Sequence, residues 1–179
     1  MRRLLPLVAA AALGCQNTVV VQTADATDLR NRTVDADPAR REPMLDAVRA
    51  LEGRWIAETP YGTSEHEFAV SSAGSVVREI MGPGEEHEMT NMYHLDGNTL
   101  VVTHYCGAGN QPRMRATGLV DGALHFEADS VSDLKDPDEH YMGSMILRFV
   151  SDDVVEQHWI SIEAGETSEM GVFTLRRAE

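Results

Sequence analysis

The chain has 179 residues, of which 15 are Lys or Arg and 29 are Asp or Glu, so its formal net charge is −14 with neutral histidines. A hydrophobic fraction of 42% excludes disorder over the whole length, and the chain is long enough for one domain with a real core. Its acidity makes nucleic acid a poor partner, because phosphate backbones are bound by clustered Lys and Arg. The two cysteines, Cys15 and Cys106, exclude a cysteine-rich zinc site and a disulfide framework.

The first fourteen residues have the pattern of an export signal. Two arginines precede the apolar stretch Leu4–Leu13, which is far shorter than the roughly 20 residues of a membrane-spanning helix. The tetrad Ala12-Leu13-Gly14-Cys15 resembles a bacterial lipobox, in which the chain is cut before a lipidated cysteine. We therefore expect a signal peptide over residues 1–14, lipidation at Cys15, and a membrane-anchored lipoprotein of the bacterial cell envelope that faces the periplasm or the exterior. An ordinary secretory signal that is cut near Cys15 is the alternative.

A flexible tether is predicted between this lipidated N-terminus and the folded domain. Residues 24–42 are rich in charge and hold hardly any large apolar side chains, so we expect residues 15–42 to form the lipidated N-terminus and tether. A short helix is predicted to begin at Pro43, a residue suited to a first turn, and to end at Gly53. Its apolar positions recur at helical spacing, at Met44, Leu45, Val48 and Leu51. The folded domain is expected to cover residues 43–179.

The rest of the chain is punctuated by turn signals and shows no second helical period. Nine turns delimit ten strands, and a spacing of about 12 residues per strand and turn is typical of barrels built from consecutive hairpins. No connection is long enough to hold a crossover helix. We predict an all-β fold, an antiparallel up-and-down β-barrel of about ten strands preceded by one short helix.

The first of three hairpins indicates which side chains face the interior. Asp96-Gly97 is a dipeptide that favours a two-residue turn, and counting outward from it places alternate residues of both strands on one face. The more apolar face carries Tyr93, Val102, His104 and Cys106, so we expect these four side chains inside the barrel.

Two further hairpins complete the expected interior. Counting from Asp121-Gly122 pairs Arg115 with Ala128 and puts Phe126 inside, which carries Arg113 and Arg115 inward as well. The turn after Val150 pairs Leu147 with Gln157 and Met145 with Trp159, all on the inner face.

The chain resembles lipocalin-like, or calycin, β-barrels over residues 43–177. The likeness rests on the short helix, on Gly53-Arg54-Trp55 in the first expected strand, and on a closing strand that ends in basic residues at 173–177. Residues 103–114, THYCGAGNQPRM, are similar to the most distinctive stretch of a group of uncharacterised bacterial lipocalin-like lipoproteins. With ten expected strands rather than eight, the pattern is more similar to fatty-acid-binding proteins and to nitrobindin-like haem barrels than to secreted lipocalins. The latter imply haem, but residues 56–61 lack the glycine-rich pattern of that group and no proximal histidine aligns, so we expect no cofactor.

Barrels of this size hold one small molecule, so we expect an exported protein that binds a small hydrophobic or amphiphilic, even anionic, ligand. Apolar side chains would contact the ligand body, His104 and Gln157 would hydrogen-bond it, and the arginines would neutralise an anionic head group. Alternatively, Arg115 pairs with an internal acid such as Glu79. The expected partners are this ligand and, through the lipid anchor, the membrane. The expected ligand-binding residues are Tyr93, Val102, His104, Arg113, Arg115, Phe126, Gln157 and Trp159.

Two other classes of function remain open. A structural or envelope-interaction role would need a barrel that is packed solid with side chains. A hydrolase-like enzyme would use His104 with Cys106, but residues i and i+2 of a strand lie about 7 Å apart, and the sequence has no Gly-x-Ser-x-Gly elbow. We therefore favour binding over catalysis. The seven histidines are scattered singly, so no metal site is expected.

Overall fold

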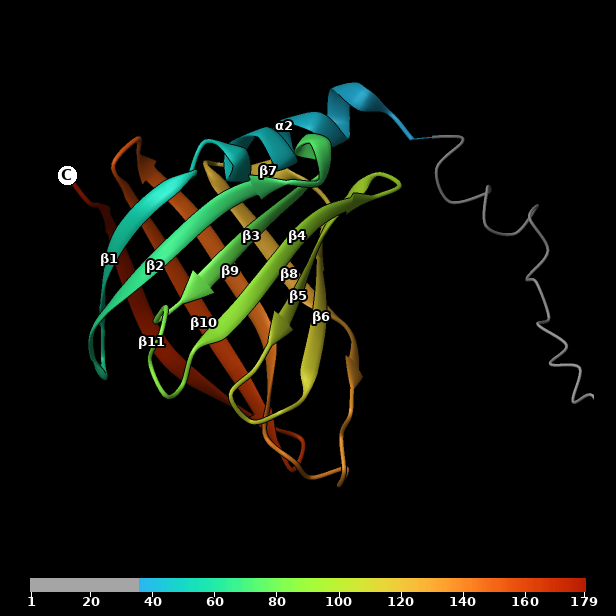
Figure 1. Ribbon diagram of the computed structural model, residues 1–179. Coiled ribbons are helices and arrows are strands. Elements are labelled where there is room, and N and C mark those ends of the chain that lie inside the picture. Colours follow the sequence, from blue (N-terminus) through green and yellow to red (C-terminus); the bar gives the residue numbers. More distant parts are fainter. Residues whose placement is uncertain (1–35) are drawn as a thin grey trace, which may run out of the picture.

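A closed barrel, with a helix across one end, is formed by residues 36–179, the part of the chain that this computed structural model describes (Figure 1). All strand pairings are antiparallel, and the sheet closes because β6 pairs with β8. The two-residue strand β7 pairs only with β8, so ten longer strands make the barrel wall. The elements are α2 (Pro38–Arg49), β1 (Gly53–Thr59), β2 (Gly62–Ser71), a 3-10 turn (Ser72–Gly74), β3 (Val76–Met81), β4 (Met89–Asp96), β5 (Thr99–Tyr105), β6 (Gln111–Ala116), β7 (Leu119–Val120), β8 (Ala123–Ser132), β9 (Tyr141–Ser151), β10 (Val154–Glu163) and β11 (Glu166–Arg177).

The predicted fold class is confirmed, and each of the nine expected turns joins two successive strands. Consecutive strands are neighbours in the sheet, and the first strand, β1, pairs with the last, β11. This meander places alternate connections at opposite ends of the barrel. The loops β1–β2, β3–β4, β5–β6, β8–β9 and β10–β11 gather at the end far from α2 (Figure 1).

The helix both begins and ends earlier than predicted, since its last residue is Arg49 and Gly53 already belongs to β1. It begins at Pro38 rather than at Pro43, because the Asp37 side chain caps it by accepting the Ala39 N–H at 3.0 Å. Residues 38–42 are therefore helical and do not belong to a tether. The expected signal peptide, the lipidation site Cys15 and the rest of the tether lie outside the described residues. Within residues 36–179, no helix is long and apolar enough to cross a membrane.

The hairpins around 97 and 152 present the faces that the sequence predicted. In β9–β10, Leu147 pairs with Gln157 and Met145 with Trp159, as expected. In β4–β5 the turn consists of Gly97 and Asn98 rather than Asp96 and Gly97. This changes the register by two residues, and an even change leaves every side chain on its predicted face.

The hairpin around Asp121 corrects the prediction for the two arginines. The chain leaves the ladder at Thr117 and Gly118, between β6 and β7, so Arg115 pairs with Glu127 instead of Ala128. A change of one residue reverses the faces of a strand. Met114 is consequently buried inside, while Arg113 and Arg115 lie on the outer surface.

The barrel interior changes in polarity along its axis. At the α2 end, Leu45 and Val48 of the helix pack with Trp55 and Phe68 in one apolar cluster, and the Trp55 indole donates to the Leu51 carbonyl at 2.7 Å. Toward the other end the buried residues include polar and ionisable side chains. These are His66, Glu79, Asn91, His104 and Gln157. The helix thus seals one end, and the polar cluster lies between that seal and the loop end.

Candidate functional site

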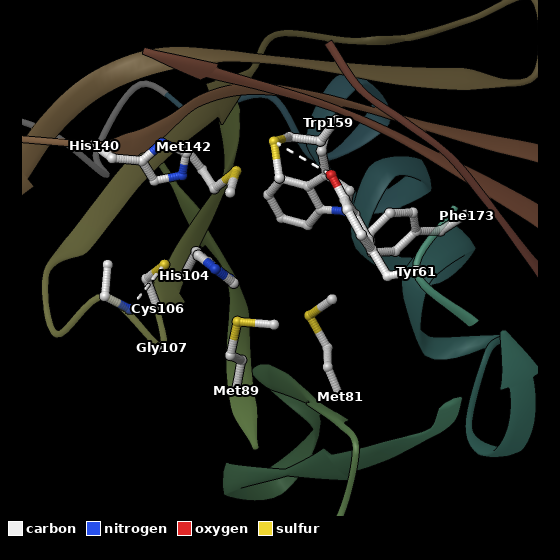
Figure 2. A pocket seen from close by; sticks show the side chains of 12 residues that line it. Tyr61, Met81, Met89, His104, Cys106, Gly107, His140, Met142, Trp159 and Phe173 are labelled. Atoms are coloured by element: carbon white, nitrogen blue, oxygen red, sulfur yellow. Dashed lines mark hydrogen bonds between the residues drawn. The ribbon is translucent and has the colours of Figure 1, made fainter. Parts of the chain in front are cut away.

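A cavity of ≈ 360 Å³ opens at the end of the barrel opposite α2. We call it the mouth cavity. Figure 2 shows its side chains pointing inward from strands on opposite walls. Most are thioethers or aromatic rings, and few are polar. The lining residues are Tyr61, Met81, Met89, His104, Cys106, Gly107, Ala108, His140, Met142, Trp159, Met170 and Phe173.

The β5–β6 loop shapes one side of the mouth. Two backbone bonds fold it tightly, from the Cys106 N–H to Asn110 O at 3.1 Å and from the Gly109 N–H to Cys106 O at 2.9 Å. Gly109 has a φ of 92°, which favours glycine. The Asn110 side chain donates to Glu139 Oε1 at 3.0 Å and to the His140 carbonyl at 2.8 Å, so it ties this loop to the β8–β9 loop. The rim is therefore held in place by its own polar side chains.

Beneath the mouth cavity, the carboxylate of Glu79 accepts four hydrogen bonds. His66 Nδ1 and Gln157 Nε2 lie 2.8 and 2.7 Å from Oε1. Asn91 Nδ2 and the Tyr93 hydroxyl lie 2.7 and 2.8 Å from Oε2. The donors come from β2, β4 and β10, so the network joins opposite walls of the barrel. A carboxylate has acceptor sites for all four, which makes this a satisfied buried charge.

These hydrogen bonds decide the protonation state of Glu79. Burial alone raises the pKa of a carboxyl group, but the bonds and charge from His66, with those from Asn91 and Tyr93, outweigh it and lower the pKa of Glu79. Burial and the neighbouring carboxylate raise the pKa of Tyr93 well above its ordinary value. The floor of the cavity therefore contains an ionised glutamate and a neutral tyrosine.

His104 links the Glu79 network to the mouth cavity. Its Nδ1 lies 2.7 Å from Asn91 Oδ1. Because the Asn91 amide nitrogen donates to Glu79, Oδ1 must accept, and the His104 Nδ1 therefore carries the hydrogen. Burial lowers the pKa of His104 to about 4, so the ring is neutral at pH 7. No described residue hydrogen-bonds its Nε2, and His104 lines the cavity.

The structure brings half of the expected ligand-binding residues together. Tyr93, His104, Gln157 and Trp159 join one network, since the Trp159 indole donates to Gln157 Oε1 at 3.3 Å and its ring centroid lies 5.1 Å from that of His104. Among the eight expected residues, His104 and Trp159 line the mouth cavity itself. Phe126 packs on Tyr93, with ring centroids 6.0 Å apart. Val102 is likewise buried, on the inner face of β5.

The two arginines take no part in this interior. Arg115 Nη1 lies 2.8 Å from Asp96 Oδ2, and its Nε lies 2.9 Å from Asp129 Oδ1. Arg113 forms longer ion pairs, each 3.3 Å, with the same two aspartates. All four side chains are half-buried on the outer wall. The expected contact between these arginines and an internal ligand or Glu79 is therefore wrong.

Sequence reasoning missed most of the residues that line the cavity. Four of the nine methionines, Met81, Met89, Met142 and Met170, face it from β3, β4, β9 and β11. Met89 and Met142 lie in hairpins whose faces were predicted, but a register shift at Ile160/Ser161 places Met142 opposite Ser161 on the inner face, against the alternation counted from the turn. A second shift, at Trp159/Ile160, lies beside Met170, and Met81 precedes a loop of uncertain length. Tyr61 and Phe173 meet edge to face at the rim, with ring centroids 6.3 Å apart.

The geometry does not assemble a nucleophilic pair from His104 and Cys106. His104 Nδ1 is bonded to Asn91, while the Cys106 sulfur accepts the Ala108 N–H at 3.5 Å. No hydrogen bond joins the imidazole to this thiol, although both residues lie within the described part of the chain. An activated cysteine needs a base within hydrogen-bond reach.

The resemblance to nitrobindin-like barrels implies haem, so we asked whether a residue of the cavity could bind a haem iron. A haem iron takes an imidazole nitrogen, and His104 presents a neutral Nε2 to an apolar cavity. His104 would therefore be the residue to hold the iron, with its ring oriented by Asn91.

The barrel is similar to one solved structure. The crystal structure of Rv2717c from M. tuberculosis superposes with a TM-score of 0.55 over 81% of this chain and 100% of that one, at 15% sequence identity. The two chains share a barrel fold. At this identity the likeness extends to the fold alone. No family model matches the chain, and no curated protein matches its sequence.

Proposed function

We propose that the protein binds a small, uncharged and mainly apolar molecule in the mouth cavity. The observation that carries this is the combination of an open cavity with a fixed floor. Thioethers and aromatic rings surround ≈ 360 Å³ of space, within the range of small-molecule sites, and the Glu79 network holds the floor rigid. A solid structural barrel would leave no such space.

The methionine lining suits a ligand body of irregular shape. Methionine side chains are unbranched and polarisable, so they adapt to different apolar surfaces. Tyr61 and Met170 form part of this wall at the rim, where the Tyr61 hydroxyl lies 3.9 Å from the Met170 sulfur. We expect apolar contacts here to supply most of the binding free energy.

One polar group of the ligand would bind His104. Its Nε2 is an acceptor in a neutral ring whose orientation is set by Asn91. A hydroxyl or N–H group is the matching partner, because it donates the hydrogen that this nitrogen accepts.

Charge in and around the cavity favours an uncharged ligand. None of the described residues that line it is Lys or Arg, and the ionised Glu79 lies just beneath. A ligand carboxylate would find no Lys or Arg among these lining residues to pair with. The anionic head group that the sequence suggested depended on inward arginines, so it is not part of this proposal.

Nile red, an uncharged apolar dye, tests the cavity. We expect saturable fluorescence enhancement at one dye per chain, and loss of it in Met142→Trp, which fills the cavity. Met92→Trp is the matched control, because Met92 lies on β4 in an outer groove with Thr90 and Tyr105. Unchanged dye binding in Met142→Trp would show that the dye binds elsewhere and would contradict the proposal.

Displacement of Nile red then tests the ligand chemistry. We expect 1-octanol to displace the dye better than octanoate at pH 8. In His104→Phe the affinity for octanol should fall by about tenfold, the loss of one hydrogen bond. Stronger displacement by octanoate would overturn the uncharged-ligand assignment.

The placement of the protein is a second part of the proposal: a lipocalin-like lipoprotein of the bacterial envelope, anchored through Cys15. Support comes from the apolar N-terminal stretch and the Gly14-Cys15 site. Native mass spectrometry of protein purified from its own host tests both the lipid anchor and the bound ligand. A diacylglyceryl mass on Cys15 would confirm the anchor, and a retained organic molecule would identify the ligand. A haem would appear as its own mass with visible absorption, and would then replace the apolar ligand proposed here.

A further inference from the structure

The inner wall of β3, β4 and β5 carries two adjacent rows of side chains. The register pairs Glu79 with Asn91 and Asn91 with His104 in one row. The next row toward the mouth pairs Met81 with Met89. Directly opposed residues of an antiparallel pair have Cβ atoms about 5 Å apart, and diagonal neighbours are within reach of long side chains. Met89 is the diagonal neighbour of His104, so two thioethers and one imidazole share this wall.

Contacts with Asn91 and Gly107 fix these groups around the same space. The Met81 sulfur lies 3.6 Å from Asn91 Nδ2, and His104 Nδ1 lies 2.7 Å from Asn91 Oδ1, so both side chains flank one carboxamide. The Met89 sulfur lies 3.8 Å from the position that a Cβ on Gly107 would take. In Figure 2, His104, Met81 and Met89 point into the cavity.

His104 has the arrangement of a metal-binding histidine without a partner on its ligating atom. Its Nδ1–H is held by Asn91, which is held in turn by Glu79. Histidines that bind metals donate the second ring N–H to such an oriented acceptor. The residue is 2% exposed, and Nε2 has no hydrogen-bond partner among the described residues. A lone pair that faces an apolar cavity is a candidate ligand atom.

We propose that His104 Nε2 and the thioether sulfurs of Met81 and Met89 bind a soft monovalent metal ion, copper(I), on this wall of the mouth cavity. Thioethers and imidazole are neutral ligands, and sulfur donors select copper(I) over harder ions such as magnesium or calcium. No described group of three His, Cys, Asp or Glu side chains is placed to hold a metal, which separates this site from zinc and calcium sites.

The inference does not depend on the proposed organic ligand. Both occupants would use His104 Nε2, but only the metal ion requires the sulfurs of Met81 and Met89 to lie beside this nitrogen. The site was also outside the sequence prediction, which considered histidine spacing and took no account of methionine.

Anaerobic titration with copper(I), in competition with a chromophoric copper(I) chelator, tests the site. We expect one ion per chain and X-ray absorption with both sulfur and nitrogen neighbours. His104→Phe and the double variant Met81→Leu/Met89→Leu should each lose at least about tenfold in affinity. Asn91→Leu, which removes the support of the imidazole, should also lose about tenfold. Met92→Leu, on the outer face of β4, is the matched control and should bind like the unmodified protein.

Cys106 needs its own variant, because a thiol alone can hold copper(I). Cys106→Ser should retain one tightly bound ion. Loss of binding confined to this variant, with the His104 and methionine variants unaffected, would overturn the proposal. Absence of stoichiometric copper(I) binding to the intact, folded protein would do so as well. Nile red binding, measured without metal, remains an independent readout of the organic-ligand proposal.

Discussion

At the scale of single residues, the polar interior depends on Glu79. Its two oxygens accept from four side chains that belong to three different strands. The sequence could place Tyr93, His104 and Gln157 inside the barrel by alternation. It could not place them around one carboxylate, because Glu79 and Gln157 are 78 residues apart and meet only when the barrel closes. A network of this kind is a property of the folded wall rather than of any local pattern.

Glu79→Gln should destabilise the protein although it preserves shape. The new amide would direct its N–H₂ group at hydrogen-bond donors, which leaves buried groups unpaired at a cost of about 3 kcal/mol. Chemical denaturation at pH 7 measures this. Glu67→Gln is the control, since Glu67 lies on the outer face of β2 and has no hydrogen bond to this network. Equal stability of Glu79→Gln and the unmodified protein would show that the network contributes nothing.

Lowering the pH should remove the contribution of Glu79 to the free energy of unfolding. Its pKa is lower in the folded state than its ordinary value of 4.5, so the folded state binds fewer protons in this range. The stabilisation is therefore complete above pH 4.5 and is lost as the pH falls through the folded-state pKa. The difference in free energy of unfolding between the unmodified protein and Glu79→Gln should shrink on acidification. A difference that is constant down to pH 3 would contradict this assignment.

At the scale of elements, the faces of a hairpin were predictable over the part of its ladder that keeps the register expected from its turn. The faces of β4–β5 and β9–β10 follow from their turns, even though the first turn is displaced by two residues. β6 was misplaced because Thr117 and Gly118 interrupt the ladder, and an interruption gives no clear signal in the sequence. The helix start was missed for a related reason, since the charged residues after Pro38 resemble a linker and their helical role depends on the Asp37 cap.

The position of Arg115 on the outer face of β6 can be tested by mutation. Arg115→Ala removes ion pairs with Asp96 and Asp129 on the outer wall, and pairs of this exposure contribute about 0.5 kcal/mol. Binding of Nile red and octanol in the mouth cavity should not change. Arg148→Ala, on the outer face of β9, serves as the comparison. A large loss of octanol binding in Arg115→Ala alone would restore an internal role for this residue.

At the scale of the whole molecule, the first and last strands of the barrel lie side by side and are tied together. β1 pairs with β11, and Arg177 donates to the carbonyls of Ala50 and Glu52, which precede β1. Its guanidinium also lies 4.3 Å above the Trp55 ring. The last residues therefore join the first strand to the end that α2 seals.

Arg177→Gln should destabilise the closed barrel by about 2 kcal/mol, from lost hydrogen bonds to carbonyls and a lost cation–π contact. Arg176→Gln is the matched control, because Arg176 is the exposed neighbour on the same strand. Denaturant unfolding of both variants measures the difference. Equal midpoints for the two variants would show that closure does not depend on Arg177.

The sealed end has a kinetic consequence for anything that occupies the interior. With α2 across one end and the polar floor beneath the cavity, we expect uptake and release to take place at the same end of the barrel, the loop end. An incoming molecule cannot push out a resident one from behind. Exchange should therefore proceed at the rate at which the resident molecule leaves, whatever the concentration of the competitor.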